Sequence, residues 1–147
     1  MVEDVQESDY IALAELRLRI REFLRGSDEA SRQAGLEPQQ YQLLLALRAV
    51  ADPSQATIGR LAESLHLKHH SVVGLVDRLE ARGFVRRRRN ADNRREVRVV
   101  LLAPGRDAVR NVVSQRLHEL RGSGRALVES IAAVLNSNQA EKASSSS

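Results

Sequence analysis

The stretch Thr57–Leu102 decides the fold; it reads TIGRLAESLHLKHHSVVGLVDRLEARGFVRRRRNADNRREVRVVLL. Its first half predicts two helices, one from Ile58 to about Leu65 and one from Lys68 or His69 to Arg82. The turn between them is His66–Leu67. Apolar residues recur in both helices at three- and four-residue intervals, which gives each helix one buried face.

Two strands are predicted after these helices, over residues 84–89 and 96–102. In the second strand Val97, Val99 and Leu101 alternate with Arg98 and Val100, the pattern of a half-buried sheet. Residues 90–93 are typical of a turn. Helix, turn, helix and hairpin in this order predict a winged helix-turn-helix, a module that sits on duplex DNA.

The charge of the chain is concentrated in this hairpin. Eight arginines and two acidic residues lie between Arg82 and Arg98, so this segment carries +6 in a chain of net charge +4. A basic patch on a near-neutral body is typical of a nucleic-acid binder. The alternative is a solvated hairpin that happens to be rich in arginine.

Further helices are predicted on both sides of the module. A first helix starts at Ser8 or Asp9 and ends near Gly35, and a second starts at Pro38. After the hairpin, a fifth helix starts at Pro104–Gly105 and a sixth follows a break at 121–124. The first helix has more apolar surface than its own neighbours can cover, which indicates an interface helix.

Composition excludes several classes of function. The chain of 147 residues has no cysteine, which excludes thiol redox sensing and thiolate metal sites and is compatible with a cytoplasmic protein. No apolar run approaches the ~20 residues that span a bilayer, and the acidic start lacks the features of a signal peptide. We find no catalytic constellation, so no enzyme and no cofactor are expected. His66, His69 and His70 indicate surface readout rather than a metal site, because no carboxylate completes a ligand set.

Over roughly residues 8–138 the chain resembles the MarR (multiple antibiotic resistance regulator) family of transcription factors. The resemblance is carried by motifs in a fixed order: Leu36-Glu37-Pro38-Gln39, Leu61-Ala62, the run VDRLEARGFVRR from Val76 to Arg87, Asp92-Asn93-Arg94-Arg95 at the hairpin tip, and Gly105-Arg106. Glu37 and Leu102 depart from the Thr or Ser that the family usually has, which affects local helix capping and not the fold.

The resemblance implies a homodimer in which the terminal helices intertwine with those of a partner. The expected fold is mainly α with a small β-hairpin wing. It comprises a helical dimerisation region (8–36 and 104–138), a winged helix-turn-helix DNA-binding domain (37–103) and a disordered tail (139–147). A two-fold dimer implies a near-palindromic operator with half-sites about 10 bp apart.

The recognition helix supplies the first set of expected DNA contacts. His69, His70, Val73 and Gly74 are candidates for reading base edges, because imidazoles can donate or accept, a valine can meet a thymine methyl, and a glycine permits close approach. Lys68, Ser71 and Arg78 suit phosphates.

The wing supplies the second set. Arg94 is expected to enter the minor groove, and the family motif implies that Asp92 holds its guanidinium in place. Arg86, Arg88 and Arg95 are expected to neutralise phosphates. Alternation places Arg87 and Arg89 on the other face of the strand from Arg86 and Arg88.

The resemblance also implies that a small aromatic or anionic effector binds, for which Tyr10, Tyr41 and Arg48 are candidate contacts. Arg17, Arg21 and Arg25 form a solvated face or meet an anionic effector. The leading hypothesis is a transcriptional repressor that the ligand releases from double-stranded DNA. The alternative is a winged-helix interaction module that binds RNA or a protein partner.

Overall fold

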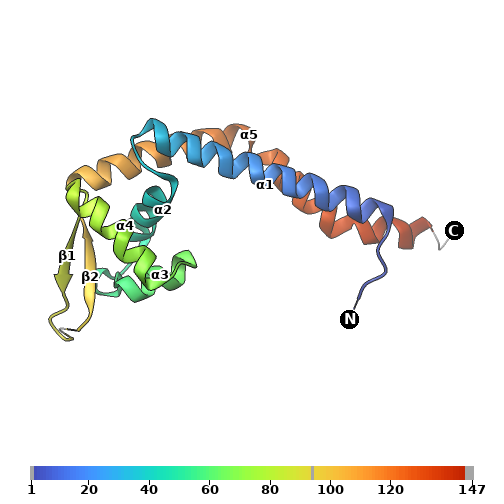
Figure 1. Ribbon diagram of the computed structural model, residues 1–147. Helices are drawn as coiled ribbons and strands as arrows, with labels where there is room; N and C mark the ends of the chain where they lie inside the picture. Colours follow the sequence, from blue (N-terminus) through green and yellow to red (C-terminus); the bar gives the residue numbers. More distant parts are fainter. Residues whose placement is uncertain (1, 94, 145–147) are drawn as a thin grey trace. The chain divides into compact units, whose positions relative to one another are not determined.

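The computed structural model describes residues 2–93 and 95–144, and side chains as far as Ser137 apart from Arg94. Figure 1 labels its elements, which follow one another in this order: α1 (Glu7–Gln33), α2 (Pro38–Ala49), the short 3₁₀ helix η1 (Pro53–Gln55), α3 (Ile58–Leu65), α4 (His69–Ala81), β1 (Val85–Arg89), β2 (Val97–Leu101) and α5 (Ala103–Ser144).

The chain forms two compact units. The winged unit comprises Asp28–Ser114, and the helical unit comprises the two ends of the chain, up to Ser27 and from Gln115. Each therefore contains part of α1 and part of α5. No helix of the described residues is long and apolar enough to cross a membrane.

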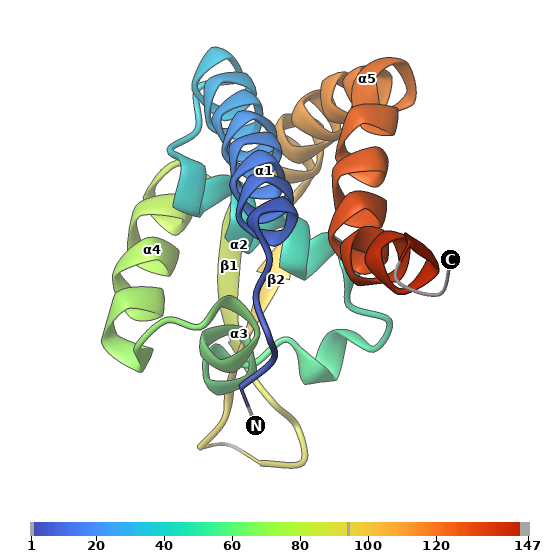
Figure 2. The ribbon, with the colours of Figure 1, turned by 90° about the vertical axis from the view of Figure 1, so that its right-hand side faces the viewer.

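The winged unit is built around the apolar faces of α2, α3 and α4. Val72, Leu75, Val76 and Leu79 recur on α4 at three- and four-residue spacing, and all four are buried because this spacing places them on one face. Leucines of α2 and α3, Val85 and Val99 of the hairpin, and Val109 and Val112 of α5 complete the core. Figure 2 shows α2, α3 and α4 gathered beside the two strands.

Side-chain hydrogen bonds cap the N-termini of α2 and α3 in this unit. The Thr57 hydroxyl accepts a hydrogen bond from the Arg60 N–H at 3.3 Å, which satisfies one free donor of α3. At the start of α2, where the sequence departs from the family's Thr or Ser, the Glu37 N–H donates to Oε1 of Gln40 at 3.0 Å. Pro38 follows at a position where its missing N–H has little cost.

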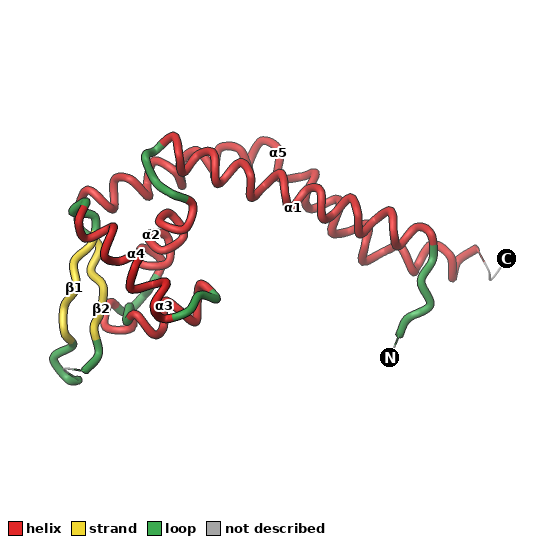
Figure 3. The backbone as a smooth tube through the Cα atoms, in the orientation of Figure 1, coloured by secondary structure: helices red, strands yellow, loops and turns green. Residues whose placement is uncertain are grey.

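The hairpin pairs β1 with β2 in antiparallel register. Arg87 lies opposite Val99 and Arg88 lies opposite Arg98. β2 is also held on its other side, because the Val99 N–H donates to the Ala56 carbonyl at 2.9 Å. The hairpin, yellow in Figure 3, is thereby joined to the loop that precedes α3.

In the helical unit the first part of α1 and the last part of α5 lie side by side and antiparallel (Figure 3). The Ser137 hydroxyl donates to Asp9 at 2.5 Å, and towards the other end Nη2 of Arg116 donates to the Phe23 carbonyl at 3.0 Å. Ala12 and Ser130 are buried. Arg116 is also buried, because its guanidinium lies over the Phe23 ring and pairs with Glu119.

Three predictions about the helices were wrong. Residues 121–124 do not break the chain into two helices but continue α5 without interruption, because a glycine costs a helix only about 1 kcal/mol and keeps its backbone hydrogen bonds. The predicted tail is helical through Ser144, since adding residues to an existing helix avoids the cost of nucleation; residues 145–147 lie outside the described part. α1 begins at Glu7, so Asp9 is no N-cap and instead accepts from the Gln6 N–H at 2.9 Å.

Candidate nucleic-acid interface

The outer face of α4 carries the residues that the sequence assigned to base and phosphate contacts. Lys68, His69, His70 and Arg78 are exposed, and Ser71, Val73 and Gly74 are half-buried. These seven residues therefore share the accessible side of the helix, while the apolar side is buried in the core. A helix that presents short and polar side chains outward has the form required to lie in a major groove.

The turn before α4 has a left-handed residue. His66 has φ 53°, which a residue with a side chain adopts less readily than glycine. The conformation is held because the Leu67 N–H donates to the Ala62 carbonyl at 3.0 Å and the His66 N–H donates to the Glu63 carbonyl at 3.2 Å. This turn sets the angle between α3 and α4.

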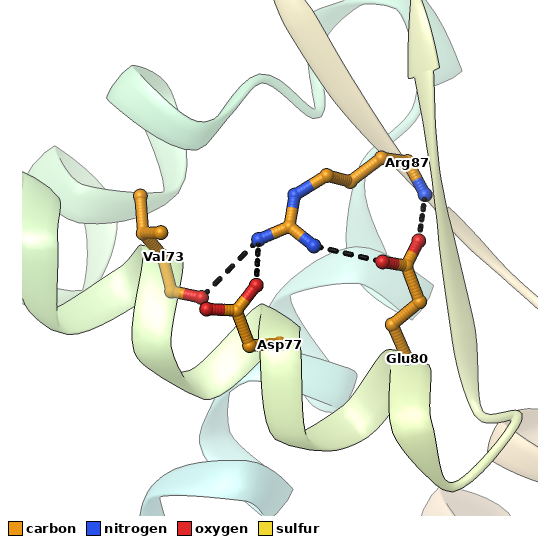
Figure 4. A network of polar contacts seen from close by, with 4 residues as sticks. All are labelled: Val73, Asp77, Glu80 and Arg87. Carbon is orange, nitrogen blue, oxygen red and sulfur yellow. Dashed lines mark hydrogen bonds and ion pairs between the residues drawn. The ribbon is translucent and has the colours of Figure 1, made fainter.

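Arg87 ties the hairpin to α4, as Figure 4 shows. Its backbone N–H and its Nη1 each donate to Glu80 at 2.8 Å. Its Nη2 donates to Asp77 at 2.5 Å and to the Val73 carbonyl at 3.3 Å. One side chain on β1 thus contacts three residues spaced along α4 and orients the wing against the recognition helix.

The electrostatics of this contact favour the charged forms. The backbone hydrogen bond from Arg87, followed by its side-chain bond and its charge, lowers the pKa of Glu80 against the opposing effect of burial. Burial alone would lower the pKa of Arg87, but the hydrogen bonds and charges of Asp77 and Glu80 outweigh it and raise that pKa. Glu80 and Arg87 are therefore both charged at neutral pH.

Neither Arg87 nor Glu80 was assigned this role from the sequence. Within the described residues Asp77 pairs with Arg87, and no carboxylate pairs with Arg78. Strand alternation contained the signal, because Arg87 is two residues after the buried Val85 and so must share its face.

The remaining wing residues are accessible. Arg86 and Arg88 are exposed, as are Asp92 and Arg95. Near the tip the Arg95 N–H donates to Oδ1 of Asn93 at 3.1 Å. Arg94 lies outside the described residues, so its proposed contact with Asp92 is without structural description.

The three candidate effector contacts do not form one site within either unit. Tyr10 is 62% exposed and belongs to the helical unit, whereas Tyr41 belongs to the winged unit and is buried in its core. Arg48 is exposed and lines a recess of the winged unit with three other arginines. In the part of the chain that the structure describes, no three metal-binding side chains gather at one place.

A recognition helix joined to a basic hairpin, with long helices before and after it, defines a winged helix-turn-helix protein. The sequence profile of the MarR family matches residues 34–96, which include all of α2, α3, α4 and β1. The match covers less than half of the 147 residues, and together with the fold it supports a winged helix protein of the MarR type. Among curated proteins, none matches its sequence.

Solved structures of transcriptional regulators have the same fold. AbsC, a MarR family transcriptional regulator from Streptomyces coelicolor, superposes with a TM-score of 0.69 at 18% identity, over 87% of this chain and 84% of AbsC. MepR from S. aureus in complex with DNA gives 0.67 at 20% identity, over 97% and 99%. CouR from Rhodococcus jostii RHA1, bound to p-coumaroyl-CoA, gives 0.65 at 23% identity, over 83% and 87%.

Proposed function

We propose that this protein is a homodimeric DNA-binding transcriptional regulator that represses from a near-palindromic operator. The observation that carries the proposal is the Arg87 network, because it fixes a basic hairpin beside the exposed face of α4. MepR, whose fold the chain shares, was solved in complex with DNA. The expected setting is the cytoplasm, and no catalytic role is proposed.

The two parts of the interface have different tasks. The wing arginines Arg86, Arg88, Arg94 and Arg95 supply affinity by neutralising phosphate and, for Arg94, by entering the minor groove, with Asp92 as its partner. His69, His70, Val73 and Gly74 select the sequence, and Lys68, Ser71 and Arg78 hold α4 to the backbone.

We propose that a second copy of the chain covers the exposed apolar surface of the helical unit. Ile11, Leu13, Leu24, Val128 and Leu135 are each more than half exposed in the single chain. Surfaces of this kind are unusual on a monomer and mark sites of association. Two copies would present two α4 helices to successive major grooves of the operator.

The test of DNA binding is a promoter-fragment shift with Arg94→Ala at several salt concentrations. We expect weaker binding at every salt concentration, because the variant loses the proposed minor-groove contact in each copy. Arg125→Ala, which removes an exposed arginine of the helical unit, is the matched control and should bind as the parent does. Equal binding by Arg94→Ala and the parent would show that the wing assignment is wrong.

A competition assay separates this proposal from the alternative of RNA or protein binding. The labelled duplex is challenged with unlabelled duplex or with RNA of the same sequence at physiological salt. Displacement by duplex alone supports a DNA regulator. Displacement by RNA at lower concentration supports the alternative, an interaction module.

The proposed regulation is release from DNA by a small aromatic or anionic effector. CouR was solved with p-coumaroyl-CoA bound, an acyl-CoA that carries both an aromatic group and phosphates. A ligand that binds one arrangement of the dimer better than the other shifts the population towards it and can lower DNA affinity. A thermal-shift screen of small anions, followed by DNA release as the readout, tests this step; Tyr10, Tyr41 and Arg48 are the candidates from sequence.

A further inference from the structure

Four arginines converge on one recess of the winged unit. Arg88 of β1 and Arg98 of β2 are register partners, so their side chains share one face of the hairpin. Arg48 near the end of α2 and Arg106 at the start of α5 line the same recess, whose volume is about 490 Å³. Pockets for small molecules commonly have volumes of roughly 300–1,000 Å³.

The charge of this recess is uncompensated. None of its lining residues is acidic, and within the described residues no carboxylate lies within ion-pair distance of any of the four arginines. Like charges directly opposite each other on a hairpin, such as Arg88 and Arg98, destabilise the pairing. The repulsion among these arginines lowers the stability of the fold, and a bound anion would remove this loss.

Arg98 gives the second, independent observation. It is half-buried, and its Nε is shielded from solvent without a hydrogen-bond partner. Buried donors in folded proteins are almost always satisfied, so this orphan donor shows that the Arg98 guanidinium lacks part of its expected set of acceptors. A guanidinium presents paired donors that match a carboxylate or a phosphate.

The rest of the lining indicates what the anion carries. Leu47, Val50, Pro53 and Val100 contribute apolar wall beside the arginines. An inorganic ion would leave this wall in contact with water, whereas an anion with an apolar body would cover it. The recess therefore fits an amphipathic organic anion better than a simple ion.

The recess is not on the face that holds α4. Arg87 points to α4, and because side chains alternate along a strand, Arg88 and its partner Arg98 lie on the opposite face of the hairpin. Phosphate contacts to DNA use protruding side chains and have no need of an apolar wall. A small ligand is thus favoured over the DNA backbone as the occupant.

We propose that this arginine-lined recess binds an organic carboxylate or phosphate with an apolar body. The inference rests on the proposed function only for the role of this ligand as effector; binding itself is independent of DNA. It gives Arg88 a ligand contact in addition to its proposed contact with a phosphate of the operator.

The test is a calorimetric titration of the full chain, without DNA, with phenyl phosphate. We expect saturable binding at least about ten times tighter than that of inorganic phosphate, because only phenyl phosphate covers the wall. Methyl NMR shifts should map to Leu47, Val50 and Val100. Absence of binding, equal affinity for inorganic phosphate, or shifts confined to other residues would overturn the proposal.

Variants locate the site. Arg98→Gln and Arg48→Gln should each weaken phenyl phosphate binding by about tenfold or more, since each removes a charged hydrogen bond to the anion. Arg48 is exposed, so its variant keeps the test valid if Arg98→Gln fails to fold. Arg60→Gln, an exposed arginine of α3 outside the recess, is the matched control and should change the affinity by less than about twofold.

A final arm distinguishes DNA phosphate from a free ligand. If a DNA duplex displaces phenyl phosphate, and if Arg98→Gln and Arg48→Gln weaken duplex binding as much as phenyl phosphate binding, the recess is a backbone contact and the proposal fails. If both variants retain duplex binding while they lose phenyl phosphate, the recess is a separate ligand site. If the parent protein does not bind DNA, the calorimetric titration with phenyl phosphate is unaffected. The proposed ligand site and the proposed DNA-binding function can therefore be rejected independently.

Discussion

At the scale of single residues, the proposed interface places opposite demands of stability and DNA binding on Gly74. It lies in the middle of α4, and a β-carbon placed there would meet no other atom within 4 Å. Gly74→Ala should therefore raise the free energy of unfolding by about 0.5–1 kcal/mol. The same methyl group would stand between α4 and a base edge, so we expect operator affinity to fall by about tenfold, or about 1.4 kcal/mol.

Gly59 in α3 is the matched control for Gly74, because a β-carbon there also meets nothing within 4 Å. Gly59→Ala should stabilise the fold in urea titration and leave operator affinity, measured by fluorescence anisotropy, unchanged. If Gly74→Ala stabilises the fold and binds the operator as tightly as the parent, the backbone of α4 does not approach DNA at this residue.

Glu80 should make stability depend on pH. Its pKa is lowered from the usual 4.5 by the hydrogen bonds and charge of Arg87. A carboxylate with a lowered pKa stabilises the fold above its unfolded pKa, and this contribution is lost as the pH falls through the folded pKa. Glu80→Gln should thus be less stable than the parent at pH 7, and the difference should shrink below about pH 4.5.

Urea midpoints of the parent and of Glu80→Gln, measured from pH 7 down to pH 3, check this expectation. Glu63→Gln removes an exposed carboxylate of α3, leaves the contacts of Glu80 with Arg87 in place, and serves as the control. A stability difference between parent and Glu80→Gln that stays constant across this range would show that the contact with Arg87 does not govern the titration.

At the scale of elements, the periodicity of apolar residues predicted the positions of most helices and strands. α3 has the predicted bounds, α4 and the strands differ from the predictions by about a residue at their ends, and the mainly helical fold with a hairpin wing is confirmed. The predicted break at residues 121–124 was wrong, because α5 continues through both glycines at a cost of only about 1 kcal/mol each. Strand alternation places Arg87 on the buried face of the hairpin, but its contact with α4 follows only when the strand and the helix are placed together.

Two glycines in α5 test whether this helix is continuous and whether its start packs closely against Phe84. Gly122→Ala places a methyl group where nothing lies within 4 Å, so in a continuous helix it should stabilise the protein by about 0.5–1 kcal/mol. Gly105 is different, because its β-carbon would overlap the Phe84 carbonyl oxygen and crowd Leu101. Gly105→Ala should cost about 1–3 kcal/mol.

Thermal unfolding of both variants gives the readout for these two glycines. A Gly122→Ala protein that is no more stable than the parent would favour a break in α5 over the continuous helix. A Gly105→Ala protein with unchanged stability would show that the start of α5 can move away from Phe84.

At the scale of the whole molecule, long-range convergence is what sequence patterns could not show. Arg48 and Arg106 lie far apart in the chain, and each alone resembles a solvated helix residue. Only the packing of α2, the hairpin and the start of α5 in one unit brings them to the recess with Arg98. The site residues of α4, by contrast, are adjacent in sequence, and helical periodicity alone separated their exposed face from the core.

The last prediction concerns the surface through which the proposed dimer associates. Val128, Ile131 and Leu135 recur on α5 at three- and four-residue spacing and are 65%, 43% and 70% exposed, which is a stripe without cover in the single chain. Ile131→Asp would bury a carboxylate among apolar side chains if two copies associate through this stripe. We expect the dimer dissociation constant to rise by at least about a hundredfold, or about 2.7 kcal/mol.

Sedimentation over a range of protein concentrations measures this change directly, and Ala133→Asp is the control. Ala133 is exposed on α5 and lies about half a helical turn from Ile131. Ala133→Asp therefore adds the same charge as Ile131→Asp on the other side of the helix. If Ile131→Asp and Ala133→Asp dissociate alike, the stripe is not the interface. If Ile131→Asp alone becomes monomeric, its operator affinity should fall with its dimer population although α4 and the wing are unaltered, because a single lobe reads only one half-site.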